Sequence, residues 1–142
     1  MLNQKAEANL ETAVDCLSKK DENFYSVGVS RAYYAIFQET KNFLVNNSFD
    51  YKLFKRHDPI AINQADYAHG SISMALEYFL RTNGFNSKAD LIFIMKMRST
   101  FWKLYEWRRH GDYKETIISK EDLEDAIEIA EEFIDGLKKY DR

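Results

Sequence analysis

The sequence predicts an all-α protein, an antiparallel bundle of four to five helices that forms a single domain over residues 1–142. Three observations support this fold class. Apolar residues recur every three or four positions in five separate segments, which is the spacing of one helix face. One proline and five glycines are too few for a turn-rich β-sandwich. No segment alternates convincingly as a strand, and the short connections favour antiparallel helices.

The first two helices are expected over about residues 2–19 and 22–46. The apolar stripe of the first is formed by Leu2, Ala6, Leu10, Ala13 and Leu17. The wider stripe of the second is formed by Val29, Tyr33, Ile36, Phe37, Thr40, Phe43 and Leu44. The opposite flank of the second helix alternates small residues such as Gly28 and Ala35 with polar ones, so another backbone can approach it closely.

A connection with turn residues and the only proline follows the second helix. The third helix is expected to begin near Asn63. Its stripe is formed by Ala68, Ile72, Ala75, Leu76 and Phe79. Gly84 suits a left-handed C-terminal cap, and Ser87 suits the next N-cap.

The fourth helix is expected over about residues 88–110, with Gly111 at its end. Its seam keeps a strict three-four spacing through Ile94, Met97, Phe101, Leu104 and Arg108. Arg108 therefore continues the apolar face. The fifth helix begins after Ser119, which has an acidic residue three positions later, as in a capping box.

Composition restricts the classes of function. The net charge of −3 gives no global case for nucleic-acid binding, although a basic patch on the fourth helix would permit it. Cys16 is the only cysteine, which excludes an intrachain disulfide. The histidines are scattered without the pairing of a zinc site, and no metal or cofactor is predicted. Without an apolar signal core or a long apolar run, we expect a soluble cytoplasmic protein with no membrane partner.

The stretch "RRHGDY" carries the densest set of candidate site residues. One interpretation is a structural pin, in which Arg108 pairs with Asp112 under Tyr113, because a buried arginine needs an acceptor. The other is metal-independent RNA cleavage, with His110 as the base and Arg108 or Arg109 stabilising the charged phosphorane. Since adjacent helical residues diverge by about 100°, such a site needs a partner chain.

Three further residues have two interpretations each. Arg31 is either a surface arginine or a phosphate contact in a groove shared with Arg108 and Arg109. Tyr33 is either a core residue, as its helical spacing indicates, or a residue that stacks on a base. His69 is either a satisfied half-buried histidine or a general base.

Two segments together resemble the HEPN family, the "higher eukaryote and prokaryote nucleotide-binding" domain. "SRAYYAIFQETKNFLV" is similar to its second-helix signature. "LYEWRRHGDYKETIISKEDLEDAIEIAEEFIDGLKKY" resembles the end of one branch, in which an arginine precedes Asp-Tyr by four positions, here Arg108, Asp112 and Tyr113. A third segment, "AHGSISMALEYFLRTNGF", also looks like the branch's third helix, with His69 in the histidine position.

The resemblance implies a HEPN-like bundle that is usually a symmetric homodimer and is often paired with a minimal nucleotidyltransferase in a toxin–antitoxin or two-subunit complex. Active members are metal-independent ribonucleases that use an arginine, four to six residues and then a histidine. Here only Lys103 has that spacing to His110, and lysine lacks the bidentate fork of arginine.

The first function hypothesis is therefore a HEPN subunit that binds a nucleotidyltransferase, an RNA or a nucleotide. In it, Arg31, Arg108 and Arg109 contact phosphate and Asp112 orients Arg108. The alternatives are a ribonuclease toxin and a purely structural interaction module. The dimer seam is expected along the second and fourth helices, where Gly28, Ala32 and Ala35 permit close approach.

Overall fold

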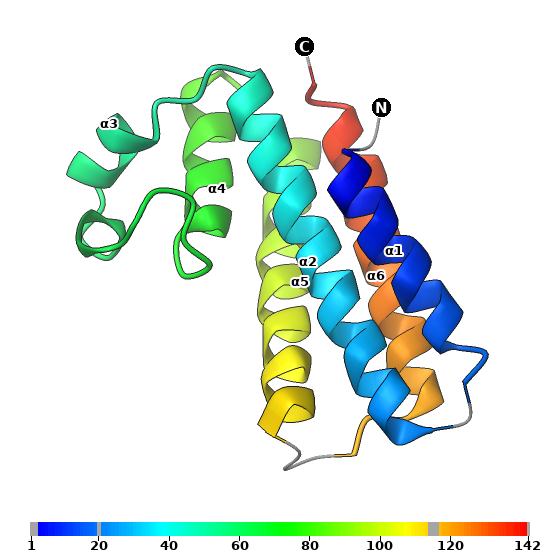
Figure 1. Cartoon of the computed structure of the whole chain (residues 1–142). Coiled ribbons are helices and arrows are strands. Elements are labelled where there is room, and N and C mark those ends of the chain that lie inside the picture. The colour runs from blue at the N-terminus through cyan, green and yellow to red at the C-terminus, as the bar shows by residue number, and fades with distance from the viewer. Residues whose placement is uncertain (1–2, 20, 114–116, 142) are drawn as a thin grey trace.

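The computed structural model describes residues 3–19, 21–113 and 117–141, and leaves the side chains of 22 and 110–113 undescribed. All regular structure in these ranges is helical, as the sequence predicts (Figure 1). The elements are α1 (Gln4–Cys16), α2 (Glu22–Asn46), α3 (Tyr51–Arg56), the short 3-10 helix η1 (Ala61–Asn63), α4 (Ile72–Thr82), α5 (Lys88–Tyr113) and α6 (Lys120–Lys138).

Helix α2 is the central element of the bundle. It packs against α1, α4, α5 and α6. Figure 1 shows α1, α2, α5 and α6 as a long bundle, with α3 and α4 to one side and both termini at the same end. The core consists of apolar side chains from every one of the long helices, among them Val29, Ile36 and Leu44 of α2, Leu76 of α4, Leu104 of α5 and Leu123 of α6.

The predicted helix ends are stabilised by local hydrogen bonds. Ser119 and Asp122 form the predicted capping box at the start of α6. Ser87 and Asp90 exchange the same pair of bonds before α5, because each side chain accepts from the other's backbone N–H. Gly84 has a φ of +86°, the left-handed conformation expected after α4.

The segment between α2 and α4 differs from the prediction. A short helix, α3, forms where only a connection was expected, because the Asp50 side chain accepts from the backbone N–H of Leu53 and the helix buries Tyr51 and Phe54. Its six residues are too few for a helical period to be visible. Likewise, α1 is shorter at both ends than the expected range of 2–19.

The expected start of the third helix near Asn63 is wrong. Only the 3-10 turn ends there, and α4 begins at Ile72. Tyr67 has a φ of +57°, a conformation that an α-helix cannot contain. Ala68 therefore lies in a loop, residues 64–71, although its spacing fits a helix. This loop places His69 beside α2.

The prediction that Gly111 ends the fourth helix is also wrong. Helix α5 continues to Tyr113, so Asp112 and Tyr113 belong to the helix by their backbone. One glycine costs a helix only about 1 kcal/mol relative to alanine, which a long packed helix tolerates. Arg108 and Asp112 are thus four residues apart on one continuous helix.

The small residues expected at a dimer seam pack inside the chain instead. A Cβ added to Gly28 would lie 2.6 Å from Leu123 Cδ1 of α6 and 3.1 Å from Cys16 Cβ of α1. Ala32 and Ala35 are fully buried. The close approach that Gly28 permits is therefore used by α1 and α6 of the same chain, and the burial of Ala32 and Ala35 within the chain does not support a seam between copies.

We expect Gly28→Leu to lower the free energy of unfolding by about 1–3 kcal/mol, because the new side chain overpacks the core between α1 and α6. Val27→Leu is the control, since Val27 is exposed. Urea denaturation at two protein concentrations measures both. If Gly28→Leu instead left the stability unchanged and only altered the concentration dependence, the seam would lie at Gly28 after all.

Candidate functional site

Arg108 of α5 lies against two neighbouring tyrosines of α2. Its Nη2 donates a hydrogen bond of 2.9 Å to the Tyr34 hydroxyl. Its guanidinium carbon is 5.1 Å from the centre of the Tyr34 ring and 5.5 Å from that of Tyr33, within the range of cation–π attraction. The side chain is half-buried, so the predicted inward position of Arg108 is confirmed.

His69 joins this group from the loop of residues 64–71. Its Nδ1 is 2.8 Å from the Tyr33 hydroxyl. Its ring stacks on Phe37, with centroids 4.1 Å apart, and lies over Tyr33 as well. The histidine is therefore held by one hydrogen bond and two aromatic faces, yet its side chain is exposed and not half-buried as the sequence suggested. We call Tyr33, Tyr34, His69 and Arg108 the Arg108 cluster.

The cluster carries one positive charge at neutral pH. Burial lowers the pKa of His69, and the charge of Arg108 lowers it further, so the imidazole is neutral. Burial raises the pKa of Tyr33, which outweighs the opposite effect of Arg108, so the phenol keeps its proton. The hydrogen bond between His69 and Tyr33 thus joins two neutral groups, and either can be the donor.

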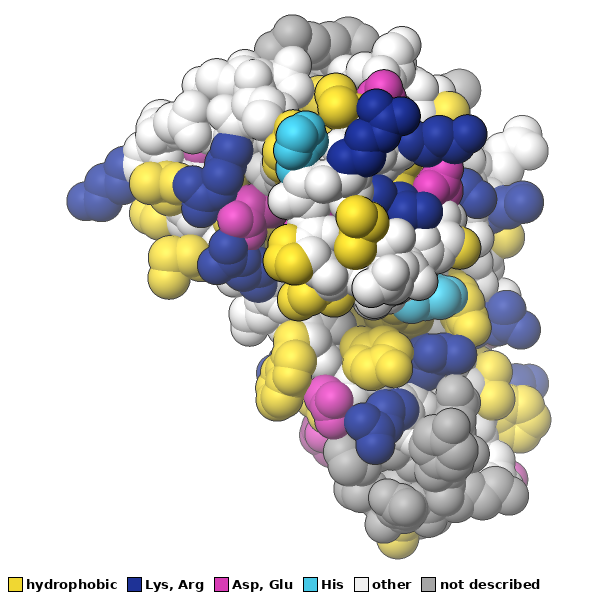
Figure 2. Space-filling view, turned by 90° about the vertical axis from the view of Figure 1, so that its left-hand side faces the viewer, with side chains coloured by type: hydrophobic (Ala, Val, Ile, Leu, Met, Phe, Trp, Pro, Cys, Tyr) yellow, Lys and Arg dark blue, Asp and Glu magenta, His cyan; other side chains and the backbone are white. Residues whose placement is uncertain are grey.

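An open pocket of about 310 Å³ adjoins the cluster. Its lining consists of Tyr33, His69, Gly70, Ser73, Arg98, Phe101, Trp102 and Tyr105. Figure 2 views the molecule from the side that carries α3 and α4, and shows hydrophobic and basic side chains interspersed around a histidine in the middle of this face. The loop before α4 and the outer side of α5 together form the walls.

The other predicted site residues have separate positions. Arg31 is exposed on α2 and its Nη1 reaches Asn9 of α1, with 3.4 Å between Nη1 and Asn9 Oδ1. It stands one helical turn before Tyr34, so it borders the cluster without a contact to Arg108 among the interactions described. Arg109 is exposed on α5. The side chains of His110, Asp112 and Tyr113 lie outside the described residues.

Tyr33 is a core residue, as its spacing predicts, because only 1% of it is exposed. It cannot offer a face to a base. Tyr34 is half-buried and accepts from Arg108, which is a role that the sequence analysis did not assign. The aromatic residues of the pocket, Trp102 and Tyr105, were also missed. Their three-residue spacing on the polar side of α5 was the signal that could have identified them.

The family of the chain follows from a comparison with protein-family models. The model described as "HEPN domain" matches residues 1–140. The chain belongs to the HEPN domain family. No curated protein and no solved structure matches it. In this HEPN domain, basic, aromatic and imidazole groups converge at the Arg108 cluster and its pocket.

Within its described ranges, this HEPN chain has neither a metal-binding cluster nor a membrane-spanning helix. No group of three or more His, Cys, Asp or Glu side chains there is arranged to hold a metal ion. None of the helices described combines the length and the apolarity that crossing a bilayer requires.

We expect His69 to titrate below the ordinary histidine value of 6.5, and its pKa to rise in Arg108→Gln, which removes the nearby positive charge. Because the folded pKa lies below the unfolded one, unfolding takes up a proton as the pH falls through 6.5, so stability decreases there. NMR titration of the His69 ring in the wild type and in Arg108→Gln measures the two pKa values.

Urea denaturation at pH 7.5 and 5.5 measures the loss of stability at the lower pH, with His69→Gln as the control. The pH dependence of stability should be smaller in His69→Gln than in the wild type. A His69 pKa at or above 6.5 would contradict the electrostatic description of the cluster.

Proposed function

We propose that this HEPN protein is a homodimeric subunit that binds the phosphate of a nucleotide or an RNA through Arg108, and that it works with a minimal nucleotidyltransferase in a toxin–antitoxin-type pair. Membership of the HEPN family supports a function related to nucleotides or RNA. We also propose that the chain belongs to the HEPN branch in which an arginine precedes Asp-Tyr by four positions, as Arg108 precedes Asp112 and Tyr113 here.

The observation that carries the proposal is the way Arg108 is held. Tyr34 fixes the guanidinium by a hydrogen bond of 2.9 Å, and both tyrosine rings stabilise its charge. A guanidinium that is oriented in advance loses less conformational entropy when it binds an anion. Its half-exposed position leaves it within reach of a ligand.

The neighbouring groups are compatible with an anionic ligand. His69 is neutral and does not compete for a phosphate, yet it can exchange hydrogen bonds with one. Arg31 and Arg109 are both exposed and lie on the two long helices of the cluster, Arg31 three residues before Tyr34 and Arg109 next to Arg108. Such charges attract a polyanion even though the whole chain has a net charge of −3.

The metal-independent ribonuclease remains the second candidate function. Arg109 and His110 follow Arg108 directly on α5, so a cation and a base are close in sequence. Catalysis of this kind would need the second copy of a dimer, because consecutive residues on a helix point about 100° apart. A purely structural module is the third class.

An RNA assay in EDTA separates these functions. We expect the wild type to bind single-stranded RNA without cleaving it, and Arg108→Ala to weaken binding about tenfold, a typical loss for one charge-assisted contact. Arg108→Lys keeps the charge but not the planar fork, so an intermediate affinity is expected. Lys96→Ala is the matched control, because Lys96 is an exposed cation of α5 remote in sequence from the cluster.

Three outcomes would contradict the binding proposal. Cleavage that disappears in His110→Ala would establish the ribonuclease. Equal binding by Arg108→Ala and Lys96→Ala would remove Arg108 from the site. Absence of nucleotide and RNA binding would leave the nucleotidyltransferase partnership alone if such a complex forms, and the structural module if it does not.

A further inference from the structure

Helix α5 presents an exposed stripe that is basic at both ends and aromatic in the middle. Arg98, Trp102, Tyr105 and Arg109 follow one another at spacings of four, three and four, so they share one face of the helix. Trp102 is 68% exposed and Tyr105 is 38% exposed. Tryptophan is highly buried on average in proteins. The exposure of Trp102 next to the exposed Tyr105 therefore indicates a binding surface.

The aromatic part of this stripe forms one wall of the pocket beside the Arg108 cluster. Phe101, Trp102 and Tyr105 line it from α5, while His69 lines it from the loop before α4 and Ser73 from α4 itself. Its volume of about 310 Å³ is at the lower end of the range for small-ligand sites. Aromatic faces with a few polar groups beside them suit a flat ring whose edge can form hydrogen bonds.

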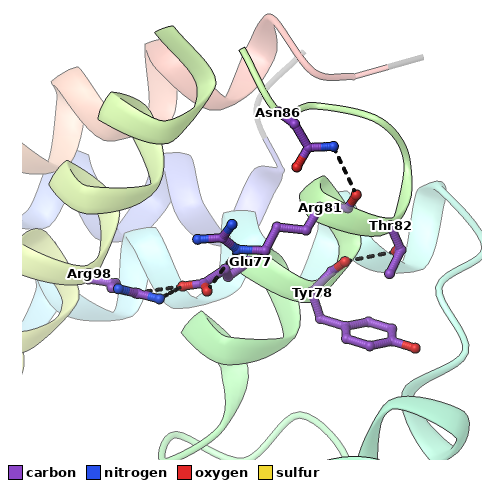
Figure 3. Close-up of polar contacts among 6 residues, drawn as sticks. All are labelled: Glu77, Tyr78, Arg81, Thr82, Asn86 and Arg98. Carbon is purple, nitrogen blue, oxygen red and sulfur yellow. Dashed lines mark hydrogen bonds and ion pairs between the residues drawn. The ribbon is translucent and has the colours of Figure 1, made fainter. Parts of the chain in front are cut away.

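The charged side chains at and beside the pocket carry a net positive charge. Glu77 of α4 accepts from Arg98 of α5 and also from Arg81, at 3.0 Å from Arg81 Nε (Figure 3). One carboxylate therefore faces two guanidinium groups, and the three side chains keep a net positive charge. Arg98 directs Nε and Nη2 at Glu77 Oε1, so the ion pair orients the guanidinium.

We propose that this pocket binds the base of an unpaired nucleotide, stacked on Trp102, with the adjoining phosphates against Arg98 and Arg109. The two arginines are eleven residues apart on α5, which is about 16 Å along a helix, a length that a few nucleotides of extended strand can cover. A duplex keeps its bases paired and stacked, so it cannot insert one into the pocket.

The ligand unit is a nucleoside phosphate, either free or within a single strand. The inference rests on the proposed function in that both require a phosphate-bearing ligand. The pocket shares Tyr33 and His69 with the Arg108 cluster, but stacking of the base is assigned to Trp102, which the phosphate site at Arg108 does not use, so the two can fail separately.

Fluorescence tests the stacking directly. The chain has two tryptophans, and Trp107→Phe leaves Trp102 as the only one. We expect single-stranded oligoadenylate to quench the emission of Trp102 and duplex RNA of the same length to leave it unchanged. Quenching by AMP as well would identify the free nucleotide as a sufficient ligand. AMP should then bind more tightly than adenosine, and Arg98→Gln should reduce that difference.

Substitutions in the protein with both tryptophans give the second test. Trp102→Ala should weaken binding of the oligonucleotide about tenfold, within the range for one stacked base. Met95→Ala is the matched control, because Met95 is 67% exposed on the same helix and does not line the pocket. Its affinity should equal that of the wild type.

Two results would overturn the inference. One is the absence of quenching by both AMP and the oligonucleotide. The other is equal affinity of Trp102→Ala and Met95→Ala. If Arg108→Ala weakened binding while Trp102→Ala did not, the proposed function would stand and the base site would be wrong. Loss of binding in Trp102→Ala with full binding in Arg108→Ala would support the base site and contradict the phosphate site at Arg108.

Discussion

The contact between Arg108 and the two tyrosines of α2 is the interaction on which the site depends. It joins α5 to the central helix of the bundle by a hydrogen bond and by the attraction of a cation to two aromatic rings. A half-buried guanidinium is stable only where its charge is compensated, so this arrangement fixes both helices relative to each other. Tyr33 extends the contact to His69, and thereby to the loop before α4.

The distribution of charge explains how a chain with a net charge of −3 can present a cationic site. The exposed acidic residues concentrate on α6, whereas α5 carries exposed basic residues, of which Arg98 lines the pocket. Within the Arg108 cluster, burial and the neighbouring cation keep His69 neutral, and burial keeps Tyr33 protonated. Positive charge at this side therefore comes from arginines, which stay charged at every physiological pH.

Much of the fold could be predicted from periodicity and capping, while most of the site could not. The second helix was predicted with its observed bounds, and Ser119 with its capping box, because both signals are local in the sequence. The loop of residues 64–71 was mistaken for helix since the left-handed Tyr67 leaves no pattern. The inward position of Arg108 followed from its spacing. Its contact with Tyr34 did not, because 74 residues separate the two and only the packing of α2 on α5 brings them together.

The most direct test of this account is a double-mutant cycle between Tyr34→Phe and Arg108→Ala, measured as free energies of unfolding in urea. Tyr34→Phe keeps the ring and removes the acceptor of the hydrogen bond. We predict a coupling energy of about 0.5–1.5 kcal/mol, the usual net contribution of such a bond. The same cycle with Arg109→Ala, an exposed neighbour on α5, should be additive. Additivity between Tyr34→Phe and Arg108→Ala to within about 0.3 kcal/mol would show that Tyr34 does not hold Arg108.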